Sequence, residues 1–411
     1  MAGNDSGGAE HAAGMIQRQM AGFKPFYQFA APTRVIAGRD LIESTGFEFT
    51  KEGAGRALVV TDEVIRGTGL VDKVEAGVAD GGLEVVGVFD NVPQDSSTQV
   101  CDACAAAAKE AGADAFLAVG GGSVMDTAKV ADAVFTHGGG ARDQEGFFLM
   151  PREDDGMGRP LDMAPLACIP TTAGTGSEVS MAAVIKVPDE NVKIEIADFP
   201  LFPRLAILDP ETTRTLPAAV AAATGLDAMT HAIEGYVSVD WSPHQDARSL
   251  QALRMIRDNL ERAVQRGEED EEARGNMLVA ANLAISIALG SVHAMSHPAG
   301  AHFGVPHGVA NAIHLPHVIR HNAAGSPDIA DRYRDIGELF DISDPEIGDA
   351  LAAYITGLVE RLGLPTRLSQ AGVPEDGIPA LVEGAMGDGT TLLNPREMSE
   401  EDYAELYRAA L

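Results

Sequence analysis

Over residues 57–135, short apolar runs alternate with longer stretches in which apolar residues recur at helical spacing. This pattern predicts, in order along the chain, strands at 57–61, 83–89 and 115–119, each followed by a helix, at 70–79, 98–111 and 124–135. Short, uninterrupted apolar strands that alternate with helices are typical of a parallel sheet covered on both faces. The first half of the chain is therefore predicted to be an α/β domain.

Strand patterns return after a glycine-rich, charged segment at 137–160, which we expect to be an exposed excursion, and they almost vanish beyond Pro217. The pattern predicts strands at 166–169, 182–187, 193–197 and 205–208, and then helices at 218–239, 245–266, 271–290 and 347–362. The acidic run 268–272 is interpreted as a solvated turn or helix start.

The change from strands to helices predicts two domains after a flexible arm. The arm covers residues 1–22, which show no periodicity. A Rossmann-like α/β domain with a parallel sheet is predicted at 23–212, and an all-α domain at 213–411. Two domains also fit the length of 411 residues, which exceeds the size at which one hydrophobic core stops growing.

Composition excludes several function classes. The formal charge of −31 and the pI near 4.6 argue against nucleic-acid binding, because an acidic surface repels phosphates. The longest apolar run, 277–290, is too short to span a bilayer, and no secretory signal opens the chain, so we expect a cytoplasmic protein without a membrane role. Three cysteines fit a reducing compartment, and Cys101 and Cys104 lie in a helical run where core packing is the expected role.

An acid and a group of histidines in the second half suggest a metal site. Asp227 and His231 are four residues apart in a predicted helix, so their side chains share one face. Such a pair can be a simple hydrogen bond, or it can bind one divalent cation. Seven of the 11 histidines lie further along the chain, between residues 293 and 321, and this clustering favours the cation: His293, His297, His302, His307, His314, His317 and His321.

A glycine-rich turn between a predicted strand and a predicted helix suggests a nucleotide site. Gly121, Gly122 and Ser123 stand where backbone N–H groups and a helix N-terminus can hold a pyrophosphate. The spacing is not GxGxxG, and an alternative interpretation is a tight turn with Ser123 as N-cap and Asp126 closing a capping box.

Two further turns fit a nucleotide. Asp62 ends a predicted strand, where a carboxylate can bind both ribose hydroxyls and repel a 2′-phosphate. Such a carboxylate would favour NAD over NADP. A role as helix N-cap explains Asp62 equally well. The run 169–178 is rich in hydroxyl groups from Thr171, Thr172 and Thr175. It suits a nicotinamide or a phosphate, although such turns often only cap helices.

With these motifs in one order, together with Lys129 and the runs 227–234 and 297–311, the chain resembles the iron-containing (group III) alcohol dehydrogenases of the dehydroquinate-synthase-like superfamily. The resemblance runs from about Phe29 to the C-terminus. It implies a cleft between the two domains, where a nicotinamide meets a metal ion. One departure lies at residues 92–95, where many members carry Asn-Pro after the proline, which puts a nucleotide contact of Gln94 in doubt.

The resemblance also implies roles for individual residues. It implies metal ligation by Asp227, His231, His293 and His307, and a place beside the substrate for His297, which spacing alone could not exclude as a ligand. We expect Pro298 to break the helix after His297. The resemblance further implies that NAD is bound by Asp62, Gly121, Gly122, Ser123, Asp126, Thr171, Thr172, Thr175 and Lys193.

The predicted reaction is hydride transfer between a small alcohol, or its aldehyde or ketone, and NAD, catalysed by an NAD(P)-dependent oxidoreductase that acts on CH–OH donors. Fe(II) is the metal that the resemblance favours, while the ligand types also suit Zn(II) or Mn(II). His297 would handle the hydroxyl proton. A homo-oligomer, in its simplest form a dimer, is expected from the resemblance.

Alternatives within the superfamily are a glycerol dehydrogenase, a maleylacetate reductase and a hydroxyacid-oxoacid transhydrogenase. The last would retain its nucleotide and release no free NADH. From another class, a metal-dependent hydrolase could use an Asp and three His to activate water, but it would not need the glycine turn or Asp62.

The acidic excess leads us to hypothesise a salt-rich cytosol. The chain has 61 acidic against 30 basic residues and no lysine after Lys193. These charges repel one another in dilute buffer and are screened at molar salt, where the Debye length is about 3 Å. We expect melting temperature and activity to rise from low salt to molar KCl. Values that stay unchanged would contradict the hypothesis and indicate an ordinary acidic protein.

Overall fold

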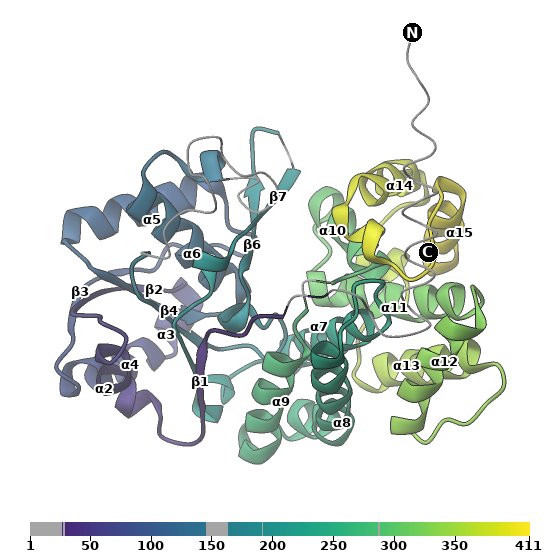
Figure 1. Ribbon diagram of the computed structural model, residues 1–411, viewed down its shortest axis with the longest axis horizontal. Helices are drawn as coiled ribbons and strands as arrows, with labels where there is room; N and C mark the ends of the chain where they lie inside the picture. The colour runs from purple at the N-terminus through teal and green to yellow at the C-terminus, as the bar shows by residue number, and fades with distance from the viewer. Residues whose placement is uncertain (1–26, 28, 145–162, 191, 287) are drawn as a thin grey trace, which may run out of the picture. The chain divides into compact units, whose positions relative to one another are not determined.

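The computed structural model describes residues 27, 29–144, 163–190, 192–286 and 288–411. The predicted arm at 1–22 and most of the predicted excursion at 137–160 lie outside these residues. The chain divides into two compact units (Figure 1). The sheet-containing unit consists of Ala31–Met229 and Met255–Ile287, and the helical unit consists of Thr230–Arg254, Ala288–Leu411 and the described residues of Met1–Ala30.

A six-stranded parallel sheet forms the centre of the sheet-containing unit. Its spatial order is β1-β8-β5-β4-β2-β3. The strands are β1 (Arg34–Ala37), β2 (Arg56–Val60), β3 (Glu84–Phe89), β4 (Ala115–Gly120), β5 (Leu166–Pro170) and β8 (Leu205–Leu208). The predicted parallel sheet is confirmed, and β1 is a strand that the sequence pattern missed.

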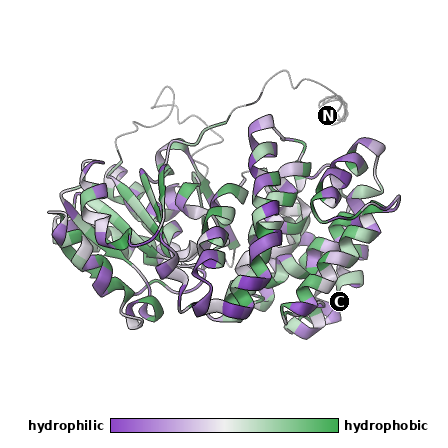
Figure 2. Cartoon of the chain, turned by 90° about the horizontal axis from the view of Figure 1, so that it is seen from below, coloured by the Kyte–Doolittle hydropathy of each residue, from purple (hydrophilic) through white to green (hydrophobic). Residues whose placement is uncertain are grey.

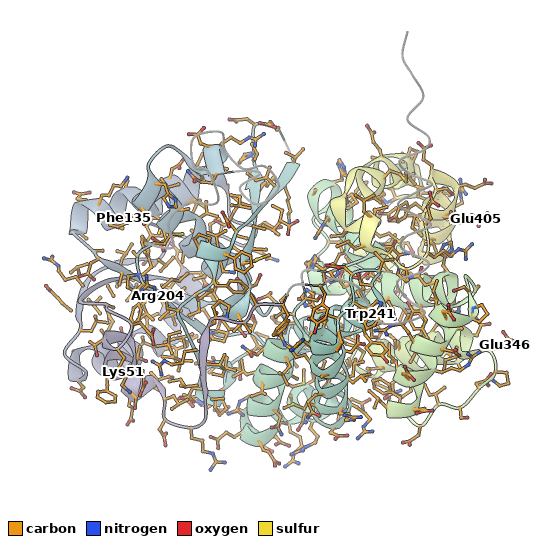
Figure 3. All side chains as sticks on the ribbon, in the orientation of Figure 1. Lys51, Phe135, Arg204, Trp241, Glu346 and Glu405 are labelled. Carbon is orange, nitrogen blue, oxygen red and sulfur yellow. The ribbon has the colours of Figure 1, made fainter. Side chains whose placement is uncertain are left out.

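Alternate residues of the central strands pack into two separate cores. Leu58 and Phe116 belong to one core, whereas their neighbours Ala57 and Leu117 belong to the other. Because successive side chains of a strand point to opposite faces, this division shows that both faces of the sheet are covered. Phe135, which is labelled in Figure 3, packs against the first core. Its ring is edge-on to that of Phe116, with centroids 5.6 Å apart.

Helices and a hairpin complete this unit. The helices before β5 are α2 (Thr45–Thr50), α3 (Glu63–Gly67), α4 (Leu70–Asp80), α5 (Thr98–Ala111) and α6 (Gly122–His137). Two predicted strands, β6 (Ala182–Val187) and β7 (Val192–Ala197), pair with each other in an antiparallel hairpin outside the sheet. Cys101 and Cys104 are buried in α5, in agreement with the expected packing role.

From β8 onward the described residues form helices and no further strand. These are α7 (Ala218–Val237), α8 (Pro243–Arg266), α9 (Glu271–Ala284), α10 (Ser291–Phe303), α11 (His307–Ala323), α12 (Pro327–Leu339), α13 (Ile347–Arg361), α14 (Ile378–Gly387) and α15 (Glu400–Ala410). Hydrophilic and hydrophobic positions alternate around them (Figure 2). Among the described residues, no helix has the length and the apolar character needed to cross a membrane.

Two predictions about these helices were wrong. The helix predicted at 271–290 ends at Ala284, because Ile285 has a non-helical ψ of 133°. Pro298 does not break α10, which continues to Phe303. Gly384 of α14 lies so close to Pro298 that a Cβ at residue 384 would come within 2.6 Å of the proline ring. The proline ring therefore packs directly against α14.

The compact units divide within α7, between Met229 and Thr230. The domain boundary predicted between residues 212 and 213 lies just after the last strand, β8. That this position separates two domains stays a prediction.

Candidate functional site

Asp227, His231 and His293 form a buried cluster. One helical turn of α7 separates Asp227 from His231, and α10 supplies His293. The three residues each offer one ligand atom, and these atoms all lie within 4.8 Å of one another. Their exposed fractions are 2%, 5% and 1%, and the rings of His231 and His293 stack with centroids 4.8 Å apart. A buried carboxylate with two imidazoles is a donor set that suits a divalent transition metal.

His307, the fourth predicted ligand, lies beside this cluster at the start of α11. Its ring centroid is 5.2 Å from that of His293. The Nδ2 atom of Asn311 lies 3.2 Å from Nε2 of His307 and 3.4 Å from Nε2 of His293. The amide of Asn311 therefore bridges the Nε2 atoms of both histidines, and His307 is outside the group of three.

Glu234 holds His293 in place, a contact that the sequence analysis missed. Its Oε2 lies 2.5 Å from Nδ1 of His293, while its Oε1 accepts a hydrogen bond of 2.7 Å from the amide of Val292. Burial raises the pKa of Glu234 to about 7. Because Nδ1 of His293 is bound to this carboxylate, a metal ion would bind at Nε2, in place of the contact with Asn311. The position of Glu234, three residues after His231, could have indicated a shared helix face.

The state of His293 also suits a metal. Burial, reinforced by the nearby His231 and His297, lowers the pKa of His293 well below its ordinary value. The neutral imidazole is the form that binds a metal ion. The buried donor set, its mutual distances and the neutral imidazole thus fit a divalent cation.

His297 lies next to the cluster and has a carboxylate partner of its own. Its ring centroid is 5.9 Å from that of His293 and 5.5 Å from that of His307. Its Nδ1 lies 2.7 Å from Oδ2 of Asp388, whose Oδ1 accepts hydrogen bonds from the amide and hydroxyl groups of Thr390. Burial alone would raise the pKa of Asp388, but the bonds from His297 and Thr390 hold it below its usual range. Asp388 is 91 residues from His297 in sequence, so spacing gave no signal for this pair.

One of the remaining histidines of the sequence cluster, His314, has contacts typical of a core residue. His314 is buried, lies 3.1 Å from Oγ of Ser296 and packs edge-on against Tyr407. Burial lowers the pKa of His314 to about 3 and that of His317 to about 4, so both are neutral near pH 7. The dense run of histidines therefore combines ligand candidates with core residues.

The predicted nucleotide turn starts α6. Gly121 is its N-cap and has no side chain with which to cap the helix. The alternative with Ser123 as N-cap is wrong, because the helix begins at Gly122 with Gly121 as its N-cap, and Asp126 accepts hydrogen bonds from Ser177 and Val184. A Cβ on Gly122 would lie 2.8 Å from the side chain of Thr175, so glycine allows the two turns to approach closely.

A buried polar chain connects α6 to the hydroxyl-rich turn. Asp126 accepts hydrogen bonds from the hydroxyl of Ser177 and the amide of Val184, at 2.6 and 3.0 Å. The fully buried Lys129 donates to the same Ser177 hydroxyl and to the carbonyl of Ala182, at 2.9 and 2.8 Å. Burial raises the pKa of Asp126 and lowers that of Lys129. Asp126 and Lys129 therefore fix the position of the hydroxyl-rich turn through Ser177.

The turn presents one polar atom that has no protein partner. Thr171 is buried, and the hydroxyl of Thr175 accepts a bond from the amide of Ser177. The buried hydroxyl of Thr172 has no hydrogen-bond partner within the described part of the chain. It lies against the glycine turn, since a Cβ on Gly121 would be 3.5 Å from it. A buried, unsatisfied hydroxyl at this place fits a polar ligand in the turn.

Asp62 and Lys193 have protein partners. Asp62 caps α3, because its Oδ1 accepts a 2.8 Å hydrogen bond from the amide of Ile65, as the structural alternative predicted. This bond occupies one carboxylate oxygen and does not exclude a ribose contact by the other. Lys193 donates from Nζ to Oδ1 of Asp95 at 2.7 Å.

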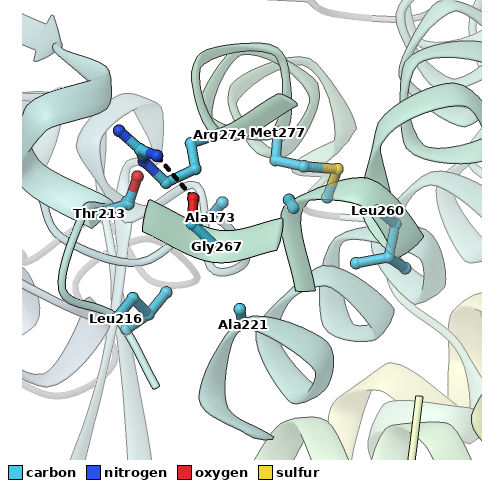
Figure 4. Close-up of a pocket in the computed structure, with 9 residues that line it drawn as sticks. Ala173, Thr213, Leu216, Ala221, Leu260, Gly267, Arg274 and Met277 are labelled. Atoms are coloured by element: carbon cyan, nitrogen blue, oxygen red, sulfur yellow. Dashed lines mark hydrogen bonds between the residues drawn. The ribbon is translucent and has the colours of Figure 1, made fainter. Parts of the chain in front are cut away.

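A separate small cavity contains none of the predicted site residues (Figure 4). Its walls are mostly apolar, and its one charged group is Arg274. The guanidinium of Arg274 donates to the carbonyls of Pro210, Gly267 and Glu268. Arg274 therefore fastens three backbone segments, and the cavity shows no chemistry of its own.

Comparison with known proteins relates both halves of the chain to one family. The model described as iron-containing alcohol dehydrogenase matches residues 32–210, and that described as the C-terminal part of the Fe-containing alcohol dehydrogenase family matches residues 221–411.

Individual proteins agree with these matches over nearly the whole chain. The chain is 36% identical over 396 residues to the 1,3-propanediol dehydrogenase of Klebsiella pneumoniae, covering 93% of this chain and 98% of that protein. It is 34% identical over 393 residues to the NAD-dependent methanol dehydrogenase of Bacillus methanolicus, covering 93% and 99%. The crystal structure of an archaeal halo-thermophilic alcohol dehydrogenase from a Red Sea brine pool has a TM-score of 0.84 and 29% identity, covering 94% and 100%.

The contact between Glu234 and His293 leads to a test. The substitution Glu234→Gln keeps the size of the side chain but removes the charge that orients His293. Loss of such a partner of a metal-binding histidine typically lowers metal affinity about 10- to 100-fold. We expect Glu234→Gln to lose Fe(II) to a competing chelator at correspondingly lower chelator concentration. The control is Glu338→Gln, at an exposed position of α12. Equal metal retention by Glu234→Gln and the wild type would contradict the assignment.

Proposed function

Because the chain belongs to the iron-containing alcohol dehydrogenase family and is an oxidoreductase that acts on alcohols, we propose that it transfers a hydride between NAD and a small primary alcohol or diol. Family membership confirms the resemblance and the enzyme class predicted from the sequence. The observation that carries the proposal is the buried cluster of Asp227, His231 and His293. Relatives named for 1,3-propanediol and methanol support the substrate class.

We propose that the cluster, together with His307, holds Fe(II). The family name favours iron, while Zn(II) and Mn(II) suit the same ligand types. When bound, the ion supplies Lewis-acid polarisation of the substrate oxygen. Glu234 fixes the ring of His293, and the side chains of the cluster are at most 5% exposed.

His297 is the residue we propose for proton transfer. Its Nδ1 is occupied by the carboxylate of Asp388, which leaves Nε2 to accept the hydroxyl proton of an alcohol or to return one to a carbonyl oxygen. Asp388 is itself fixed by Thr390, so the ring has a defined orientation.

For the nucleotide, we propose binding by the two turns and their flanking residues. The unsatisfied hydroxyl of Thr172 and the helix N-terminus at Gly121 and Gly122 support this placement. The further contacts proposed are those of Asp62, Ser123, Asp126, Thr171, Thr175 and Lys193. A carboxylate at Asp62 supports NAD over NADP, since it would repel a 2′-phosphate. The NAD-dependent relative supports the same preference.

We also propose a cytoplasmic homo-oligomer adapted to high salt, with a dimer as its simplest form. The charge of −31 supports salt adaptation, and so does the similarity to a halo-thermophilic enzyme. Three cysteines without a described disulfide support a reducing compartment. Closed symmetric dimers are the commonest assembly of soluble oligomers.

The proposed function is tested on protein purified without oxygen. We expect bound iron and the appearance of free NADH with primary alcohols and diols, whereas a transhydrogenase would release none. In His297→Ala the iron should remain while kcat falls about 100-fold, because general acid–base catalysis contributes on this scale. In His293→Ala both iron and activity should be lost. Absence of both metal and nucleotide turnover in the wild type would defeat the proposal, and full turnover of His297→Ala at every pH would remove the role of His297.

A further inference from the structure

A carboxylate lies beside two residues of the proposed nucleotide site. Asp95 accepts a hydrogen bond of 2.7 Å from Nζ of Lys193, and its own amide donates to the hydroxyl of Ser123 at 3.2 Å. The side chain of Asp95 is 50% exposed, whereas that of Lys193 is only 19% exposed. Asp95 thus engages the one lysine that we propose for NAD, next to the turn proposed for its pyrophosphate.

The backbone of Asp95 is held in an uncommon conformation. Its φ is +55°, in the left-handed region that few residues other than glycine, asparagine and aspartate adopt. Proline cannot adopt this φ, so a chain with Asn-Pro at this place could not present the same carboxylate. Backbone strain of this kind often accompanies a functional contact.

Neighbouring elements fix the segment that carries Asp95. The carbonyl of Ser96 accepts a 2.8 Å bond from the amide of Lys186 in β6. The hydroxyl of Ser96 accepts a 2.6 Å bond from Thr127 in α6. The carboxylate of Asp95 is therefore held on the same side as Ser123 and Lys193.

From this arrangement we infer that Asp95 competes with the nucleotide for Lys193 and so sets nucleotide affinity. NAD carries two negative charges on its pyrophosphate. To bind them, Lys193 exchanges an ion pair with Asp95 for one with the nucleotide, and the freed carboxylate stays nearby as a like charge. Both effects weaken binding, and both fade as salt screens the partly exposed groups. The inference rests on the proposed function, in which Lys193 contacts NAD.

The test is calorimetric titration of NAD into the metal-loaded full-length protein, at about 50 mM and about 2 M KCl. Asp95→Asn removes the charge, keeps the side-chain size and tolerates the left-handed backbone. We expect it to bind NAD about threefold to fivefold more tightly at low salt, the range of an exposed ion pair. At high salt its affinity should equal that of the wild type. Asp95→Gly, which relieves the backbone, should behave in the same way.

Combining Asp95→Asn with Lys193→Met distinguishes competition for Lys193 from simple repulsion between Asp95 and the nucleotide. Lys193→Met should weaken NAD binding, and Asp95→Asn should then tighten it less than it does in the wild-type background, because only the repulsion by the carboxylate remains. The control is Asp349→Asn, which breaks an exposed pair with Arg320 and should leave affinity unaltered. Wild-type affinity of Asp95→Asn at low salt would overturn the inference, as would equal tightening in the Lys193→Met background. Absence of NAD binding by every variant would instead refute the proposed function.

Discussion

The removal of polar groups from water around α7 and α10 is the constraint on which the site depends. Asp227, His231, Glu234 and His293 are all at most 5% exposed. Burial of such groups costs free energy unless hydrogen bonds or a cation compensate for the lost hydration. The bond between Glu234 and His293 supplies part of this compensation. A cation bound by the clustered ligand atoms would supply the rest. The same burial keeps His293 neutral, which is the state that ligation needs.

The nucleotide side depends on close approach rather than on burial of charge. The turn before α6 and the turn after β5 come together because Gly122 has no side chain to meet Thr175. The hydroxyl of Ser177 donates to Asp126 and accepts from Lys129, and these two bonds hold the second turn in place. The buried hydroxyl of Thr172 and the backbone N–H groups at the start of α6 are thereby available to a phosphate-containing ligand.

Periodicity predicted the regular parts of the fold because apolar strands and amphipathic helices differ in period. It therefore found α5 and β6 with their observed bounds, and the parallel sheet. It missed β1, a four-residue edge strand whose alternate residues are exposed. It also expected a break at Pro298, because local rules take no account of Gly384 packing against that ring. Within the site, Asp227 and His231 could be paired from spacing alone, whereas Asp388 approaches His297 only through tertiary structure, and the ligand role of His307 stays a prediction.

The central claim is that a divalent metal joins α7, α10 and α11 at the buried cluster. Its most direct measurement is anomalous X-ray diffraction at the iron absorption edge, from crystals grown without oxygen. The account predicts one strong peak within coordination distance, about 2.0–2.3 Å, of Asp227, His231, His293 and His307. A fully occupied peak elsewhere, or an iron-replete protein whose peak lies beyond reach of these four side chains, would contradict it.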